Sequence, residues 1–218
     1  MSEVSVIMST YCRNRSAIGC PNLLKRALDS IRMQTFRDWE LILIDDGSRD
    51  GTSEVCKSYA NKDNRIRYFR FEENSGCPAV RYNDGMKLAT SPYFMFMFDD
   101  DFWYSHAISA LLTAKKREYK DCGMVYGLTD IIDYQNPRSR KMNFGMPWDL
   151  KKIREKNLLG NLSVIVPRGT INVVGGYDES KVLRRWCDWD LWQRIGHRFT
   201  VCRLPVVIGC SMAKYEDS

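Results

Sequence analysis

The chain has 218 residues, of which 44% are hydrophobic and 28% are charged, and its formal net charge is +6. This composition excludes a disordered chain and suits one globular domain with a sizeable core, or two closely packed halves. The positive charge permits an acidic ligand or an anionic membrane surface. Lysine and arginine are nevertheless spread along the sequence, which favours a mixed, solvated surface over a concentrated basic track for nucleic acid.

The cysteines and the N-terminus bear on the cellular compartment. The eight cysteines include no Cys-x-x-Cys pair, and with only two histidines the chain lacks the spacing of a zinc finger. We therefore expect reduced thiols in a reducing compartment, which predicts a cytoplasmic protein. Glu3 stands where a signal peptide would carry basic residues, and no apolar run is long enough to span a bilayer.

Strand and helix patterns alternate through the first hundred residues. Apolar and β-branched runs predict strands at 4–9, 39–44, 66–71 and 94–98. Helical spacing predicts crossover helices between them, two of which begin near Pro21 and Pro78. Such alternation predicts an α/β fold with a mostly parallel, doubly wound, Rossmann-like sheet and helices on both faces.

Two of these strands end in acids. Asp45 and Asp46 follow the second strand, and the triplet Asp99 to Asp101 follows the apolar run at 94–98. Open α/β sheets bind ligands at the carboxyl edge of their strands, so we expect the acids to meet there. Three adjacent carboxylates repel one another and suit a hard divalent cation that also holds phosphate oxygens. The alternative is an acidic loop that caps the next helix.

Other phosphate-binding devices are missing from the sequence. No G-x-G-x-x-G follows the first strand, and no G-x-x-x-x-G-K-[ST] occurs anywhere. Dinucleotide-binding and P-loop interpretations therefore lose their main support. A metal ion on the aspartate triplet is the remaining means of holding phosphate.

The second half of the chain is organised differently. We expect helices at 106–116 and 186–195, strands at 123–126, 128–132 and 163–166, and a turn at Gly175-Gly176. The loop from Gln135 to Trp148 is a candidate mobile lid over the site, or else an ordinary surface excursion. Because no linker or repeat intervenes, we expect a single compact domain of two abutting halves, 1–101 and 102–218.

Six segments together carry a resemblance to a known family. They are Val4–Tyr11, Ile44–Thr52, Asn74–Arg81, Asp99–Asp101, Gly175–Glu179 and Cys187–Leu191. In this order they resemble the inverting family 2 glycosyltransferases, and the resemblance covers nearly the whole chain. It implies the GT-A fold, with residues 1–101 binding a nucleoside diphosphate sugar, most often a UDP-sugar, and residues 102–218 binding the acceptor.

The resemblance also implies roles for residues of the first half. Thr10, Tyr11 and Arg13 would line the nucleoside pocket. Asp46 would accept a hydrogen bond from the base, and Arg81 would lie near the base and the phosphates.

The aspartate triplet resembles the DXD element of the family. Asp100 would face the ribose or the sugar, and Asp101, with Asp99 beside it, would bind Mn²⁺ or Mg²⁺ bridging the diphosphate. Such a cation neutralises the charge that grows on the leaving group as the anomeric bond breaks. Asp188 stands where the family keeps the general base that takes the proton of the acceptor hydroxyl. From the residues alone, a helix N-cap is the favoured interpretation of Asp188.

The sequence departs from the family pattern in three places. Cys187 replaces the usual Glu before the catalytic Asp, so a contact to the acceptor or the sugar is lost or replaced. The QxxRW element of processive synthases is absent, and so is the distal His that some relatives add to the metal. We therefore expect a non-processive enzyme that makes a single transfer, or a catalytic domain cut from a longer protein. Its acceptor would be a hydroxyl of a glycan, of a lipid-linked or protein-linked group, or of another molecule, and association with a membrane surface is compatible with this.

Two other classes of function remain as alternatives. A catalytically inactive nucleotide-sugar-binding module would keep Asp46 and Asp101 but would not need Asp188. A two-metal nuclease also places acids at strand ends, but its substrate would favour a concentrated basic track, which this sequence lacks.

Overall fold

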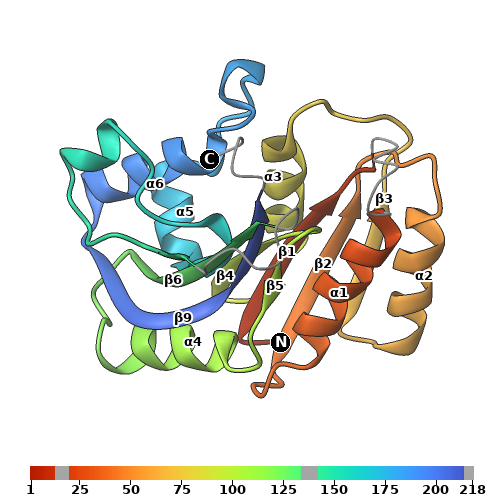
Figure 1. Cartoon of the computed structure of the whole chain (residues 1–218), viewed down its shortest axis with the longest axis horizontal. Helices are drawn as coiled ribbons and strands as arrows, with labels where there is room; N and C mark the ends of the chain where they lie inside the picture. The colour runs from red at the N-terminus through yellow and green to blue at the C-terminus, as the bar shows by residue number, and fades with distance from the viewer. Residues whose placement is uncertain (13–19, 134–141, 214–218) are drawn as a thin grey trace.

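The computed structural model describes residues 1–12, 20–133 and 142–213, and within these ranges nine strands form one curled sheet (Figure 1). The strand order is β3-β2-β1-β4-β8-β6-β9-β5, and β7 pairs with β6. The strands are β1 Val4–Thr10, β2 Trp39–Asp45, β3 Ile66–Arg70, β4 Tyr93–Phe98, β5 Phe102–Trp103, β6 Met124–Asp133, β7 Met142–Phe144, β8 Val164–Pro167 and β9 Val201–Ala213.

Six α-helices and three short 3-10 helices connect these strands within the described ranges. The α-helices are α1 Cys20–Arg32, α2 Thr52–Lys62, α3 Pro78–Leu88, α4 Ala107–Arg117, α5 Arg168–Val174 and α6 Cys187–Arg198. The 3-10 helices are η1 Lys152–Arg154, η2 Asn161–Ser163 and η3 Lys181–Leu183. The mixed α/β architecture expected from the sequence is confirmed.

The first four strands are all parallel, as the alternation of strand and helix predicts. β1 lies between β2 and β4, with Thr10 opposite Asp45 and Ser9 opposite Phe98. β2 then pairs with β3. The carboxyl ends of β1, β2 and β4 therefore meet at one edge, the upper edge of the sheet in Figure 1. This register brings the two acidic segments of the sequence together.

The second half of the sheet mixes strand directions. β8 runs antiparallel to both β4 and β6, whereas β6 and β9 are parallel to each other. The two strands expected at 123–126 and 128–132 are one strand, β6, with an irregularity at Gly127, where a side chain would collide with Ile208. The long strand β9 was not predicted, because Pro205 interrupts its pattern. Pro205 lies at the shift in register between β6 and β9, where a missing N–H is tolerated.

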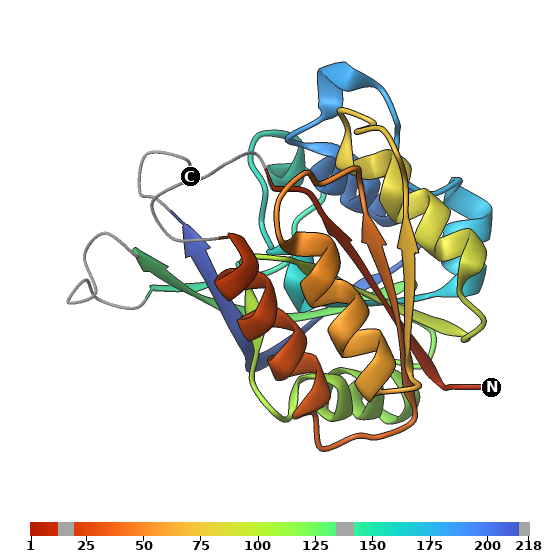
Figure 2. The ribbon, with the colours of Figure 1, turned by 90° about the vertical axis from the view of Figure 1, so that its right-hand side faces the viewer.

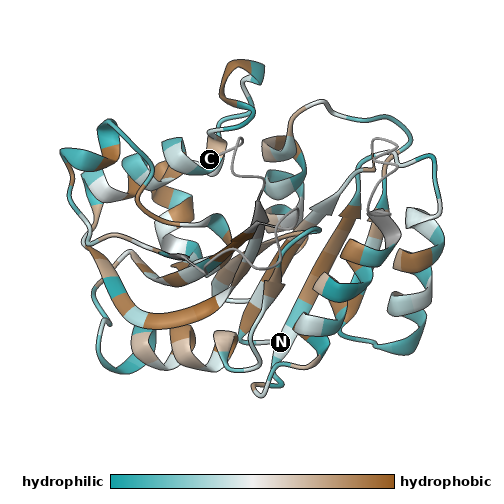
Figure 3. Ribbon diagram, viewed as in Figure 1, coloured by the Kyte–Doolittle hydropathy of each residue, from teal (hydrophilic) through white to brown (hydrophobic). Residues whose placement is uncertain are grey.

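The helices cover both faces of the sheet, each over its own hydrophobic core. α1, α2 and α4 pack on one face and α3, α5 and α6 on the other (Figure 2). The central strands are strongly hydrophobic, and the polar residues of the helices face outward (Figure 3). Because strand side chains alternate, neighbours such as Ile7 and Met8 of β1 enter different cores.

The structure also bears on the predictions about the cysteines, the lid and membrane-spanning segments. Cys122 and Cys202 are joined by a disulfide, so the prediction that all eight cysteines are reduced is wrong for this pair. Residues 135–141 of the predicted lid lie outside the described ranges. The last part of that segment contains β7 and Trp148, whose ring centroid lies 6.4 Å from that of Tyr126. None of the helices described is both long and apolar enough to cross a membrane.

Candidate active site

The acid after β4 is tied directly to the end of β1. The Thr10 hydroxyl donates to Asp99 Oδ2 at 2.6 Å, and Thr10 itself is buried. Tyr11, the next residue, is 37% exposed at the surface of the same edge. Arg13, the third residue expected in the nucleoside pocket, lies outside the described residues. The structure thus brings Thr10, Tyr11 and Asp99 together at the predicted edge.

Asp46 lies in a fixed and nearly buried position. Its Oδ1 accepts hydrogen bonds from Arg81 Nε at 2.5 Å and from the Ser75 N–H at 2.9 Å. Its Oδ2 accepts from Asn74 Nδ2 and from the Ser75 hydroxyl, each at 2.8 Å. Four donors match the four lone-pair directions of a carboxylate, so the group is oriented before any ligand arrives.

The turn after Asp46 requires glycine. Gly47 has φ of +80°, and a Cβ there would lie 2.9 Å from backbone atoms of Glu73 and Asn74. The close approach of the two loops lets Asn74 and Ser75 reach Asp46. The sequence pattern identified this turn but did not show which loop packs on it.

Asp45 points to the other face of β2 and has a structural role. Its carboxylate is buried and accepts from the Ser48 N–H and from the hydroxyls of Ser53 and Tyr68. The alternation of strand side chains therefore separates two adjacent acids, one held in the core and one at the site.

The aspartate triplet occupies the tight turn between β4 and β5. Asp101 is buried, Asp99 and Asp100 are partly exposed, and the Arg26 guanidinium donates to the Asp100 carbonyl. No cluster of three or more His, Cys, Asp or Glu side chains suited to a metal occurs among the described residues. Mg²⁺ is commonly held by one or two carboxylates together with substrate phosphates, so Asp99 and Asp101 fit a cation shared with a diphosphate.

Asp188 lies in the first turn of α6 and is not its N-cap. Trp186 is the N-cap residue, so the capping alternative is wrong. Asp188 is partly buried, and its Oδ1 accepts from the Trp189 N–H at 2.8 Å. Burial raises the pKa of the carboxyl to about 6, against the opposing effect of the backbone hydrogen bonds. A carboxylate with this pKa accepts a proton more readily than an exposed one does.

Tyr82 connects the aspartate triplet with Asp188. Its buried hydroxyl donates to the Met97 carbonyl at 3.2 Å, two residues before Asp99. Burial raises the pKa of this hydroxyl well above its ordinary value, and the charges of Cys187, Asp99, Asp101 and Asp188 add to the effect. Phe96, one residue before Met97 in β4, lies with its ring centroid 6.3 Å from that of Trp192, one turn after Asp188 in α6, although 87 sequence positions separate Asp101 from Asp188.

Sequence patterns assigned no role to the residues that hold these groups together, although Tyr177 falls within the segment Gly175–Glu179. The Tyr177 ring stacks on Tyr82 with centroids 5.2 Å apart, and the Tyr177 hydroxyl donates to Asn161. The Tyr177 N–H donates to Asn83 Oδ1, and Asn83 Nδ2 donates to the Tyr177 carbonyl. Gly175 and Gly176 have φ of +91° and +76°, which confirms the predicted turn before this segment. Burial of Tyr82 and Tyr177 in an otherwise apolar core is the feature that sets them apart.

Comparison with protein families gives a match over most of the chain. The model described as glycosyl transferase family 2 matches residues 5–175. An uncharacterised glycosyltransferase of Rickettsia typhi is 31% identical over 200 residues, which are 87% of this chain and 57% of that protein. A Campylobacter jejuni protein named as a GalNAc(5)-diNAcBac-PP-undecaprenol β-1,3-glucosyltransferase is 34% identical over 119 residues, 55% of this chain and 36% of its own. The chain spans less than two thirds of the length of these relatives.

Solved structures share the fold at low sequence identity. Staphylococcus aureus TarS 1–349 in complex with UDP-GlcNAc has a TM-score of 0.76 at 17% identity, covering 97% of this chain and 59% of that one. The mannosyltransferase PcManGT of Pyrobaculum calidifontis, in complex with GDP-Man and Mn²⁺, has a TM-score of 0.72 at 16% identity, covering 98% and 58%.

Proposed function

The chain belongs to glycosyl transferase family 2, and from this premise we propose that it is an inverting, metal-dependent, non-processive transferase. It moves one sugar from a nucleoside diphosphate sugar, preferably a UDP-sugar, to a hydroxyl of a glycan or a lipid-linked acceptor. The observation that carries the proposal is the packing of β4 against α6: the ring centroid of Phe96, in the strand that leads to the aspartate triplet, lies 6.3 Å from that of Trp192, one turn after Asp188. A leaving-group site and a base must adjoin each other for a single displacement.

The nucleoside half of the proposal concerns Asp46. Its four lone-pair directions are filled, so a uracil imide must replace one of the present donors. The Ser75 hydroxyl is the group that can leave, because it has one proton and a second acceptor, the Cys77 carbonyl, at 3.0 Å. Arg81 then keeps Asp46 in place while the base binds.

The diphosphate half concerns Asp99 and Asp101. Both would hold Mn²⁺ or Mg²⁺, which when bound neutralises charge on the leaving diphosphate. Thr10 fixes the orientation of Asp99 through its 2.6 Å hydrogen bond. Asp100, whose carbonyl is held by Arg26, would present its side chain to the ribose or the sugar.

Asp188 would take the proton of the acceptor hydroxyl as that oxygen attacks the anomeric carbon. Its Oδ1 is held by the Trp189 N–H in the first turn of α6. The exposed Trp186 ring beside it, 56% exposed, offers a surface on which an acceptor sugar can stack.

A direct test measures nucleotide release and product configuration. UDP release from a panel of UDP-sugars is measured with Mn²⁺ and with a chelator, beside GDP- and dTDP-sugars, and the anomeric configuration of the product is read by NMR. We expect chelator-sensitive release, inversion, and a single mass increment on the acceptor. A retained configuration contradicts the single displacement, and a ladder of long products contradicts the single transfer.

Two controls separate the alternative functions. Cleavage of a labelled oligonucleotide without UDP release would favour the nuclease. Tight binding of UDP-sugars without turnover, with or without candidate acceptors, would favour the inactive binding module.

A further inference from the structure

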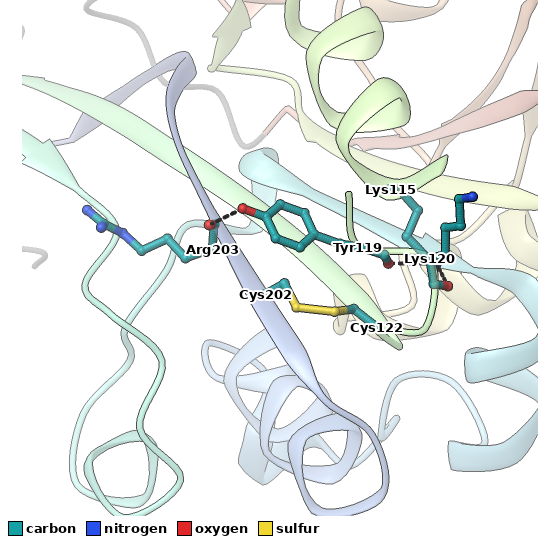
Figure 4. The surroundings of a disulfide bond; sticks show 6 residues. All are labelled: Lys115, Tyr119, Lys120, Cys122, Cys202 and Arg203. Atoms are coloured by element: carbon teal, nitrogen blue, oxygen red, sulfur yellow. Dashed lines mark hydrogen bonds between the residues drawn. A yellow bond between two sulfur atoms is a disulfide. The ribbon is translucent and has the colours of Figure 1, made fainter. Parts of the chain in front are cut away.

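The disulfide joins two segments that are far apart in the sequence but adjacent in the sheet. Cys122 lies in the turn between α4 and β6, and Cys202 is the second residue of β9, 80 positions later (Figure 4). The bond therefore spans β6, β7, β8, α5 and α6, and the enclosed segment includes Asp188. Cys122 is 8% exposed and Cys202 is partly exposed, so the pair lies near the surface.

Hydrogen bonds hold the two segments opposite each other independently of the sulfur atoms. The Gly123 N–H donates to the Thr200 carbonyl at 2.9 Å, and Met124 is in register with Val201. The Tyr119 hydroxyl donates a long hydrogen bond of 3.5 Å to the Arg203 carbonyl (Figure 4). Reduction would leave these contacts in place, so the two thiols would stay close enough to rejoin.

A lysine fixes the turn that leads to Cys122. The Lys115 ammonium donates to the carbonyls of Tyr119 and Lys120, in the turn that leads to Cys122 (Figure 4). Burial raises the pKa of the Cys56 thiol and raises that of Cys187 to about 12, so these two free cysteines form the reactive thiolate poorly.

We propose that Cys122 and Cys202 are a reversible oxidation site that sets the stability of the segment carrying Asp188. A small disulfide such as oxidised glutathione is the oxidant. One cysteine thiolate attacks it and releases one glutathione thiolate, and the second cysteine thiolate then attacks the mixed disulfide and releases the other. Two cysteine thiols are oxidised, one glutathione disulfide is reduced to two thiols, and the protons balance.

The bond acts mainly on the unfolded chain. A cross-link over 80 residues restricts the unfolded ensemble, whereas the β6–β9 ladder persists in the folded state with or without it. Reduction is therefore expected to lower the melting temperature without unfolding the protein. For a chain of this size the expected decrease is roughly 5 to 15 °C.

The test compares melting temperatures of the full chain in dithiothreitol and in oxidised glutathione. The parent should melt at the lower temperature in dithiothreitol. The double variant Cys122→Ser, Cys202→Ser should melt near the reduced parent in dithiothreitol, and its difference between the two buffers should be clearly smaller than that of the parent. Cys56→Ala, which removes an unrelated buried thiol, should keep the full difference between the buffers. A difference between the buffers that is as large in the double variant as in the parent would overturn the proposal, because other cysteines would then account for all of it.

Differential alkylation of the parent gives a second measurement that does not depend on how the variants fold. The parent is equilibrated in glutathione buffers of increasing oxidation, alkylated, digested and analysed by mass spectrometry. Cys122 and Cys202 should lose alkylation together and recover it on reduction. Full alkylation of both in every buffer would contradict the proposal. These readouts do not depend on sugar transfer, so their failure is separate from a failure of the proposed function.

Discussion

Arg81 donates from Nε to Asp46 Oδ1 at 2.5 Å, and its guanidinium also lies over the Phe71 ring, 3.5 Å from the centroid. This ion pair joins the end of β2 to α3. The residue after Arg81 is Tyr82, which supports β4 through the Met97 carbonyl. One turn of α3 therefore positions both the proposed base-binding acid and the strand that ends in the aspartate triplet.

Replacing Arg81 should weaken nucleotide binding. Arg81→Ala removes the only guanidinium that the described residues place on Asp46, and a hydrogen bond to a charged group is worth roughly 1.5 to 3 kcal/mol. We expect the Kd for UDP, measured by calorimetry, to rise about 10- to 150-fold. Arg65→Ala, which breaks an ion pair with Asp63 at the opposite end of β3 from the site, is the control and should leave the Kd unchanged. Equal UDP affinity in parent and Arg81→Ala would show that the ion pair has no part in binding.

Removing one carboxylate of the triplet should abolish metal-dependent binding. Asp101→Asn keeps the shape of the buried side chain but removes a charged oxygen ligand, so Mn²⁺ should no longer increase the affinity for UDP. Sugar transfer should be lost with it. Asp38→Asn, at an exposed position before β2, should behave as the parent does. An Asp101→Asn variant whose UDP binding still improves with Mn²⁺ would exclude Asp101 as a ligand.

The parallel half of the fold was accessible from the sequence because local patterns specify it. The run Phe94 to Phe98 is apolar throughout, as a strand buried on both faces must be, and the acids follow it directly. The carboxyl-edge rule then placed Asp46 and Asp99 near each other without any knowledge of side-chain contacts.

The remaining features depend on contacts between distant residues. Pro205 interrupts the strand pattern of β9, so β9 is recognised only from its pairing with β6. The Cys122–Cys202 bond has no local spacing signal, because its two cysteines meet through that same pairing. The roles of Tyr82 and Asn161 are equally non-local, since each acts on a partner at least 15 positions away.

We expect Glu40, which lies far from the site, to make a contribution to the free energy of unfolding that is lost in acid. Its carboxylate is buried near the start of β2, and hydrogen bonds from Thr90, Ser5 and Arg67 outweigh the effect of burial and lower its pKa to about 2. A depressed pKa stabilises the folded state above the unfolded value near 4.5, and the stabilisation is lost as the pH falls towards 2. The contribution is about 2 to 3 kcal/mol at neutral pH.

Glu40→Gln should therefore have a lower free energy of unfolding than the parent at pH 7, measured by urea unfolding. The difference in free energy should become smaller as the pH falls from 4.5 to 2. Glu118→Gln, at an exposed position at the end of α4, serves as the control and should unfold as the parent does at each pH. A gap between parent and Glu40→Gln that stays constant over this pH range would show that the buried network is not linked to protonation.

Asp188 gives the sharpest prediction about mechanism. With its pKa raised to about 6 by burial, the carboxylate is mostly ionised at pH 7, and the transfer rate should fall about tenfold per pH unit below 6. Asp188→Asn keeps the size of the side chain but cannot take a proton, so single-turnover transfer should drop roughly 10²- to 10⁴-fold while donor binding is retained. Asp190→Asn, two residues later in the same turn and paired with Arg194, is the matched control and should transfer at nearly the parent rate.

The raised pKa of Asp188 also predicts that a rise in pH increases the transfer rate but lowers the stability of the parent. The folded state binds the proton of Asp188 more tightly than the unfolded state does, so the parent loses stability as the pH rises from 3.8 through 6. Asp188→Asn has no such proton to lose and should melt a few degrees above the parent at pH 8, since 1 kcal/mol corresponds to about 2 to 4 °C in a chain of this size. A slow variant that also melts lower would indicate a damaged fold, and a stable variant with nearly normal transfer would exclude Asp188 as the base. Slow transfer together with a raised melting temperature is the combination that general-base catalysis by a buried carboxylate requires, because burial both activates the group and destabilises its charged form.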